Sequence, residues 1–452
     1  MNLSPYQMLF SGYTELRTQE NTVTQIKLLN GNPVVNTRQS AAGVSARVYK
    51  NGSWGFASGA VTDADGIMAA IKNATDNASF LDRKQAKGMG PLPVRPYCGQ
   101  ILLKGKTPNQ QMLMDYLKAL DAYIVDHCPT LQSRSVMLQI LIIEKTILTS
   151  DGTEYQSYLP RTILSCSMTA DRNGSPVSER ETFGGLGEFY DHFGDPAAMY
   201  GEIDSLYEHL MRKKEGVYAE KGKKICILDA DLAGILAHEA IGHTVEADFV
   251  LSGSIAKNYL GKEVAGEKVT LIDFAHSYEG KHCPIPIYAD DEGCEAKDAV
   301  IIENGILKGY MHSKASAMRF GVEPTGNARA YRFSDEPLIR MRNTAIARGT
   351  DKLEEMISSV EDGYYLQNPG NGQADATSEF MFAVTRGREI KNGKLGRALL
   401  DTTISGIAFD VLKSVTMVSD DFKWVCSGMC GKKQPIPVGM GGPALKCTIT
   451  IG

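Results

Sequence analysis

The segment GVSARVYKNGSWGFAS, residues Gly43 to Ser58, alternates apolar and polar side chains on both sides of Asn51-Gly52. Alternation with a period of two is typical of a half-buried strand. Asn-Gly between two such runs is the strongest short-range signal for a β-hairpin. The segment therefore predicts two antiparallel strands that meet at Asn51-Gly52.

The same kind of signal recurs along the chain. Turn dipeptides close strand-like runs at Asn30-Gly31, Asp151-Gly152, Asn173-Gly174, Asn304-Gly305 and Asn392-Gly393. Helical periodicity is confined to a few segments, such as residues 111–126, and residues 88–108 resemble an irregular crossing. Because hairpins outnumber crossovers, we expect an α+β protein, with two lobes built on curved, mainly antiparallel sheets and flanking helices. The polar run KKEGVYAEKGKK, residues 213–224, favours a division into residues 1–215 and 216–452.

The composition is that of an ordinary globular protein: 452 residues, 43% hydrophobic and 22% charged. It excludes a disordered chain, a collagen and a coiled coil. The net charge of −5 leaves no basic excess for a phosphate backbone, so we expect no direct binding of nucleic acid. The most apolar run, Val136 to Ile143, is far shorter than the roughly 20 residues that a membrane helix needs. With no secretory signal visible, we expect a cytoplasmic protein with reduced cysteines and no membrane contact.

One segment carries chemistry: DLAGILAHEAIGHTVE, residues Asp231 to Glu246, where His238 and His243 flank Glu239 on an otherwise apolar helix. Burying two imidazoles without partners is costly, and a metal ion bound to both would remove that cost. Glu239 would then remain free to act as a general base on water bound to the metal. The helix would open the C-terminal lobe.

The spacing of the two histidines is unusual. In H-E-x-x-x-H they stand at i and i+5, which on an α-helix places their side chains about 140° apart. Both can reach one ion only if the helix widens, as it does at a π-type turn. We therefore predict a π-bulge or kink between His238 and His243, near Gly242.

Other interpretations fit these residues as well. One buried histidine and one unrelated surface histidine would give the same spacing. A third ligand must come from elsewhere, and the glycine-rich tail offers Cys426 and Cys430. Glu246 stands three residues beyond His243, where it could accept a hydrogen bond from that imidazole or be an ordinary exposed glutamate.

The helix resembles the HEAxGHxxE signature of the TldD/PmbA peptidases, historically called modulators of DNA gyrase. The match is on His238, Glu239, Ala240, Gly242, His243 and Glu246. It continues in order through DDEG (290–293), ENGILKGYM (303–311), PTGN (324–327), RMRNT (340–344), GNGQAD (370–375) and CGK…PVGMGGPALK (430–446). The resemblance covers essentially all of the C-terminal half, and the N-terminal half more loosely.

The resemblance implies a metallopeptidase with one zinc or iron ion per chain. Its ligands would be His238, His243 and Cys430, with Glu239 as the general base and Cys426 outside the ligand set. The family works as two related subunits, so a homodimer or a heterodimer is implied, and this chain carries the histidine motif of the TldD-type subunit.

The expected substrate is an unfolded or extended peptide. Gly439, Gly441 and Gly372 lie in segments where such a peptide could approach the backbone closely, although glycines that only make turns would look the same.

Two other functions stay open. The chain could be a non-catalytic interaction protein that modulates a target of the DNA gyrase type, or a metal-site subunit active only with a metal-free sister chain. Asp290, Asp291 and Glu292 could bind a cation or a substrate amine, although a DDEG cluster is more typical of a solvated turn. No role follows from the sequence for Arg340 or Asn343.

Overall fold

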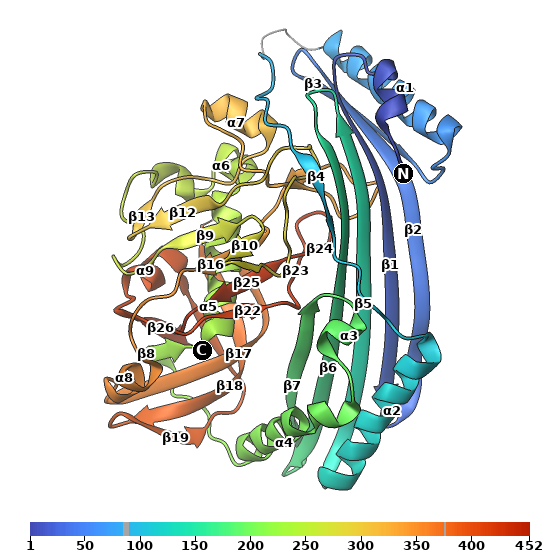
Figure 1. Cartoon of the computed structure of the whole chain (residues 1–452). Helices are drawn as coiled ribbons and strands as arrows, with labels where there is room; N and C mark the ends of the chain where they lie inside the picture. The colour runs from blue at the N-terminus through green and yellow to red at the C-terminus, as the bar shows by residue number, and fades with distance from the viewer. Residues whose placement is uncertain (85–89, 375–376) are drawn as a thin grey trace.

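The computed structural model describes residues 1–84, 90–374 and 377–452, and it shows two lobes side by side (Figure 1). Both lobes are built on curved sheets with flanking helices, and the helix with the two histidines opens the C-terminal lobe. The predicted α+β fold is therefore confirmed. The division at residue 215 stays a prediction.

The N-terminal lobe is built on one long sheet in the order β3-β2-β1-β5-β6-β4, with β7 also paired to β6. Only the pairing of β4 with β6 is parallel. The strands are β1 (Tyr13–Leu29), β2 (Asn32–Lys50), β3 (Ser53–Gly59), β4 (Cys98–Leu102), β5 (Leu131–Thr149), β6 (Glu154–Arg172) and β7 (Ser175–Leu186). The helices are α1 (Ala64–Asp82), α2 (Gln110–His127), α3 (Phe189–His192) and α4 (Tyr200–Lys214), with 3₁₀ turns at Ser4–Leu9 and Pro196–Met199.

The hairpins form where the turn dipeptides predicted them. Asn51 and Gly52 join β2 to β3 with φ of 49° and 98°, and Asn30 and Gly31 join β1 to β2 with φ of 47° and 79°. Type I′ turns need positive φ at both central residues, which is why Asn-Gly is selected there. The irregular crossing expected at residues 88–108 is wrong in part, since it contains β4; its residues 88 and 89 lie outside the described residues.

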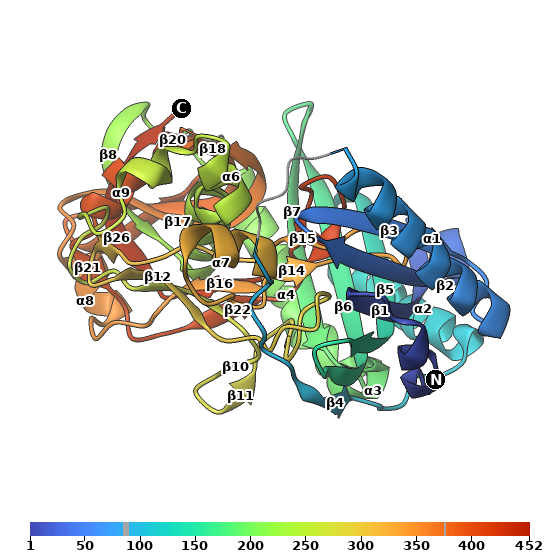
Figure 2. The same ribbon diagram turned by 90° about the horizontal axis from the view of Figure 1, so that it is seen from above.

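The two faces of the long sheet differ. Helices α1 and α2 cover the face turned away from the C-terminal lobe (Figure 2), where their apolar side chains pack on residues such as Leu16 and Ile26. Four odd-numbered residues in the first part of β1 point the other way and are buried polar residues: Glu15, Arg17, Gln19 and Asn21. Because side chains alternate across a strand, one run of sequence supplies both faces.

Ion pairs join this polar face to the C-terminal lobe. Asp291 lies 2.7 Å from the Nζ of Lys145 and 3.2 Å from the Nη1 of Arg17, and Glu292 lies 2.7 Å from the Nη1 of Arg47. Asp290 is buried and accepts the backbone N–H groups of Glu292, Cys294 and Ala328. A solvated turn at DDEG is therefore wrong: Asp290 holds the turn itself, and Asp291 and Glu292 join it to the N-terminal lobe.

The described part of the C-terminal lobe contains two large sheets and three two-stranded ones. In the first, β17, β8, β26, β20 and β18 pair in sequence and β18 pairs again with β17, so the strands close into a ring. Its strands are β8 (Gly222–Leu228), β17 (Asp362–Ala374), β18 (Glu379–Lys391), β19 (Lys394–Ala398), β20 (Thr402–Ile407), β21 (Met417–Val418) and β26 (Leu445–Ile451). The second has the order β13-β12-β9-β16-β25-β22. Its strands are β9 (Leu271–Phe274), β12 (Ala299–Glu303), β13 (Ile306–Leu307), β16 (Asn343–Ile346), β22 (Lys423–Val425) and β25 (Gly439–Gly442).

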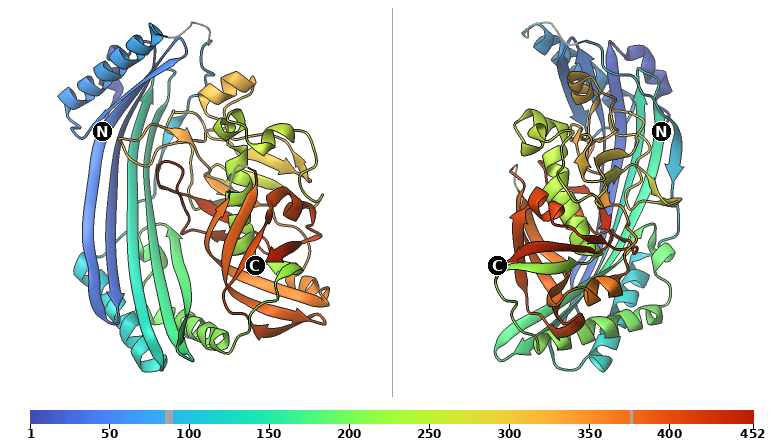
Figure 3. Two further views of the ribbon diagram at one scale, coloured as in Figure 1. Left: turned by 180° about the vertical axis from the view of Figure 1, so that it is seen from behind. Right: turned by 90° about the vertical axis from the view of Figure 1, so that its left-hand side faces the viewer.

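Helix α5 (Ala230–Ile235) packs against strands of both sheets and runs through the interior of the lobe (Figure 3). Shorter elements complete the lobe: β10 (Ser277–Tyr278), β11 (Lys281–His282), β14 (Ala328–Arg329), β15 (Leu338–Ile339), β23 (Met429–Cys430), β24 (Ile436–Pro437), α6 (Ala247–Leu251), α7 (Lys314–Phe320), α8 (Leu353–Ser358) and α9 (Ala408–Lys413). Among the described residues, no helix is long and apolar enough to cross a membrane.

Candidate metal centre

The helix with the two histidines changes its winding where they stand. Asp229 caps α5, accepting the N–H of Leu232 at 2.9 Å, and the chain continues as a π-helix over Leu236–Gly242. The π-bulge predicted from the i, i+5 spacing is confirmed. A π-helix bonds i to i+5, so residues five apart lie nearly above one another. The rings of His238 and His243 accordingly have centroids 5.5 Å apart.

Gly242 makes room at this bulge for Met341, in the segment between β15 and β16. A Cβ at Gly242 would lie 1.9 Å from the sulfur of Met341. No side chain tolerates such an approach, so glycine lets Met341 pack directly against the π-helix. The side chain of Met341 therefore packs against the widened turn and supports it.

Cys430 completes a group of three possible ligands. It lies in β23, which pairs with β24, and its Sγ is 3.4 Å from the Nε2 of His243. One ligand atom from each of His238, His243 and Cys430 lies within 4.8 Å of the others. Residues 187 positions apart in the chain thus meet at one point.

These residues fit a metal ion. His238 is only 1% exposed, and both of its ring nitrogens are buried without a hydrogen-bond partner in the described part of the chain. A buried polar atom left unpaired costs about 1–3 kcal/mol, which a metal bond would offset. Two imidazoles and a thiolate form a donor set typical of zinc.

The electrostatics favour the thiolate. Burial would raise the pKa of the Cys430 thiol, but the neighbouring imidazoles of His238 and His243 outweigh it and lower that pKa to about 3. Burial would lower the pKa of His243, but Cys430 and Glu246 raise it to about 10. The two shifts together favour a Cys430 thiolate beside a protonated His243, so a metal ion that bound both would take the thiolate as it is and displace a proton from His243.

Glu239 stands beside both imidazoles. Its Oε1 lies 3.9 Å from the Nε2 of His238 and its Oε2 lies 3.7 Å from the Nε2 of His243. The side chain is 25% exposed, whereas that of His238 is 1% exposed. The carboxylate thus borders both the imidazoles and the solvent, where a general base could meet water.

Glu246 is buried and contacts His243. The Nδ1 of His243 lies 3.0 Å from the Oε2 of Glu246, which leaves Nε2 turned toward Cys430. Lys432 donates to the same oxygen at 3.1 Å and to Asp248 at 2.7 Å. Lys432 and Asp248 were not predicted from the sequence. The only hint there is that they stand two residues beyond Cys430 and Glu246.

The other candidates lie outside this group. Gly441 is paired on both sides, with Ala345 and with Trp424, and the Sγ of Cys426 lies near Gly185 instead of at the site. A peptide therefore cannot pair with the sheet at Gly441, and any other role of this glycine in binding peptide stays a prediction. Gly439 is buried, and a Cβ there would meet Asn343 Oδ1 at 2.5 Å. Gly372 is exposed, near the end of β17.

Known proteins are similar in sequence to this chain over its whole length. Family models described as PmbA/TldA metallopeptidase domain 1, central domain and C-terminal domain match residues 14–78, 104–203 and 221–452. A metalloprotease of Methanocaldococcus jannaschii is 32% identical over 461 residues, covering 100% of both chains. The chain belongs to the PmbA/TldD metallopeptidase family.

Other family members agree in sequence or in fold. A zinc metalloprotease TldD homolog of Saccharolobus solfataricus is 29% identical over 407 residues, covering 89% of this chain and 88% of that protein. A putative modulator of a DNA gyrase from Thermotoga maritima has a TM-score of 0.74 at 20% identity, covering 96% of each chain. TldE from Thermococcus kodakarensis has a TM-score of 0.73 at 16% identity, covering 99% of each. Both structures show the PmbA/TldD fold, and the chain is a metallopeptidase of this family.

Proposed function

We propose that the chain is a zinc-dependent peptidase that hydrolyses unfolded or extended peptides, with one ion per chain held by His238, His243 and Cys430. The observation that carries the proposal is the buried imidazole of His238, whose nitrogens have no partner in the described residues although Cys430 and His243 lie beside it. The zinc metalloprotease among the relatives supports the choice of metal. The soft thiolate favours zinc over magnesium or calcium.

The residues divide the chemistry between them. Zinc held by these ligands would supply a Lewis acid that polarises a scissile carbonyl and acidifies water. Glu239 takes a proton from the attacking water at its carboxylate and passes it to the leaving amine. Glu246 accepts the Nδ1–H of His243, which keeps the Nε2 of that ring free to bind metal.

A comparison of one protein in two states tests the proposed substrate class. Reduced and alkylated protein should be cleaved, and the same protein in its native fold should not be. A chelator should abolish cleavage, and added zinc should restore it. Cleavage of both states at equal rates would contradict the preference for unfolded chains, and activity that survives chelation would contradict the metal mechanism.

Glu246→Gln should weaken zinc binding by about 10- to 100-fold, the usual effect of losing a partner that orients a metal-bound histidine. The amide keeps the shape of the side chain but removes the charge that faces His243 and Lys432. Zinc affinity measured by competition with a chromophoric chelator checks this, with exposed Glu354→Gln as the control. Equal affinities in the two variants would assign Glu246 to packing alone.

The proposal includes assembly with a related chain, as a homodimer or a heterodimer. The support is the TldE structure, which has the same fold over 99% of this chain. Light scattering on the purified chain, alone and mixed with a related metal-free chain, would detect either form. A monomer under both conditions would contradict it.

A further inference from the structure

Arg340 follows β15 directly and is fully buried. Its guanidinium faces the segment that carries Cys430. Nη2 donates to the carbonyl of Cys430 at 2.7 Å, and Nη1 donates to the carbonyls of Lys432 at 3.0 Å and Gln434 at 2.8 Å. One side chain thus holds three backbone groups within five residues of the chain.

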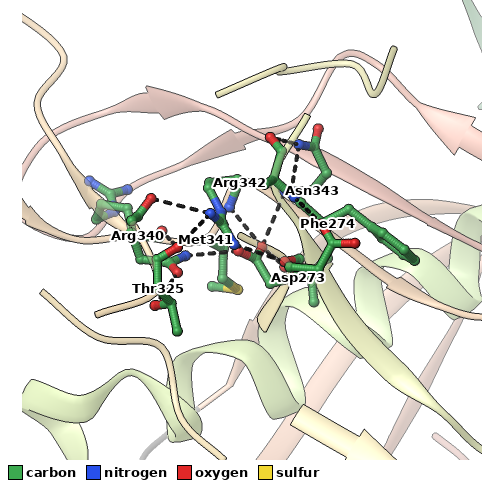
Figure 4. A network of polar contacts seen from close by, with 12 residues as sticks. Asp273, Phe274, Thr325, Arg340, Met341, Arg342 and Asn343 are labelled. Atoms are coloured by element: carbon green, nitrogen blue, oxygen red, sulfur yellow. Dashed lines mark hydrogen bonds and ion pairs between the residues drawn. The ribbon is translucent and has the colours of Figure 1, made fainter. Parts of the chain in front are cut away.

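Arg340 has no carboxylate partner among the described residues. Its neighbour Arg342 is equally buried but forms an ion pair with Asp273 at 2.8 Å, and Figure 4 shows the guanidinium of Arg340 pointing away from that pair. A buried charge is costly unless it is paired or richly hydrogen-bonded. For Arg340, hydrogen bonds to the three carbonyls offset part of the cost of burying the charge. The position of the guanidinium and the backbone conformation of residues 430–434 therefore depend on each other.

The segment needs such support. The ladder between β23 and β24 consists of two pairs, Met429 with Pro437 and Cys430 with Ile436. Between them, Lys433 has a φ of 54°, in the left-handed region that disfavours residues other than glycine. Such a conformation persists only where the surroundings hold it. The bonds to Arg340 lie on both sides of this residue.

The segment between β15 and β16, which carries Arg340, also contacts the π-helix. Arg340 is anchored through its backbone, since its N–H donates to the carbonyl of Asn327 at 2.8 Å and its carbonyl accepts from the Nδ2 of Asn327 at 3.0 Å. The next residue, Met341, is the one that packs against Gly242. Arg340 therefore contacts the segment that carries Cys430, and Met341 contacts the π-helix that carries the two histidines.

We propose that Arg340 is a positioning residue that fixes the Cys430 sulfur relative to His238 and His243. It acts through the backbone carbonyls, and the inference rests on the metal site proposed above. Lysine cannot replace it, because an ammonium lacks the planar fork that reaches carbonyls on both sides of a turn.

The test compares Arg340→Lys and Arg340→Met with Arg388→Lys in the whole chain. Arg388 is a matched control, since it too donates to backbone carbonyls, those of Gly396 at 2.8 Å and Leu395 at 3.4 Å. Zinc affinity should fall about 10- to 100-fold in both Arg340 variants, by analogy with other outer-shell changes, and stay within about twofold in the control. In the cobalt-loaded variants of Arg340, the sulfur-to-cobalt charge-transfer band should weaken or shift.

A double-mutant cycle separates this role from a general role in folding. In a Cys430→Ser background, Arg340→Lys should cost little further zinc affinity, because the group it positions is gone. Arg340 variants with wild-type affinity and an unchanged cobalt band would overturn the proposal. So would a metal-free Arg340→Lys chain that does not fold, since Arg340 would then serve the core at large.

The proposed metal site and the proposed role of Arg340 can be contradicted separately. A wild-type chain that binds neither zinc nor cobalt contradicts the proposed metal site. A wild-type chain that binds both, beside Arg340 variants that bind them equally well, contradicts only the role of Arg340.

Discussion

Glu239→Gln is expected to lower kcat for peptide hydrolysis by about 10²- to 10⁴-fold while the chain keeps its metal. Glutamine preserves the size of the side chain but cannot take a proton. Because the Glu239 oxygens lie 3.7 Å and 3.9 Å from the histidine nitrogens, the carboxylate is placed beside the ligands without being needed as one. Steady-state kinetics on an unfolded protein substrate, with metal content measured on the same preparation, check both parts.

Two results would contradict this assignment. Loss of the metal together with the activity would make Glu239 a ligand. Retention of activity within about tenfold would remove it from proton transfer. Exposed Glu354→Gln serves as the control for the loss of a carboxylate elsewhere.

Cys430→Ser is expected to weaken zinc binding by about 100-fold or more, beyond the range typical of outer-shell changes. A serine hydroxyl is not ionised near neutral pH, whereas the site holds Cys430 as a thiolate, with its pKa lowered to about 3 by His238 and His243 against the opposing effect of burial. Zinc affinity by chelator competition measures the loss, and activity should fall with occupancy.

Cys426→Ser is the matched control, because Cys426 lies in the same tail, and burial raises the pKa of its thiol. Its variant should bind zinc as the wild type does. If the two cysteine variants lose zinc equally, the ligand assigned in the tail is wrong.

Local features could be predicted from the sequence because their causes are local. Asn51-Gly52 adopts the two positive φ angles that a tight hairpin requires, whatever surrounds it. The i, i+5 spacing of His238 and His243 predicted the π-helix, since only a widened turn brings such residues together.

Features that depend on distant residues could not be predicted in this way. The burial of Asp291 depends on Arg17 and Lys145, which belong to the other lobe. The role of Arg340 appears only when the segment after Cys430, about 90 positions along the chain, folds back over its guanidinium. The pairing of β25 likewise depends on β16, a strand far earlier in the sequence, as well as on the nearby β22, so the sequence alone did not show that Gly441 lies between two strands.

The central claim is that one metal ion sits at His238, His243 and Cys430, and metal content tests it most directly. Elemental analysis is made on the chain purified without chelators or affinity nickel, beside His243→Ala purified in the same way. We expect close to one zinc per wild-type chain and almost none in the variant. A wild-type chain that contains no metal and takes up no added zinc would contradict the account, and it would favour an interaction protein on this fold.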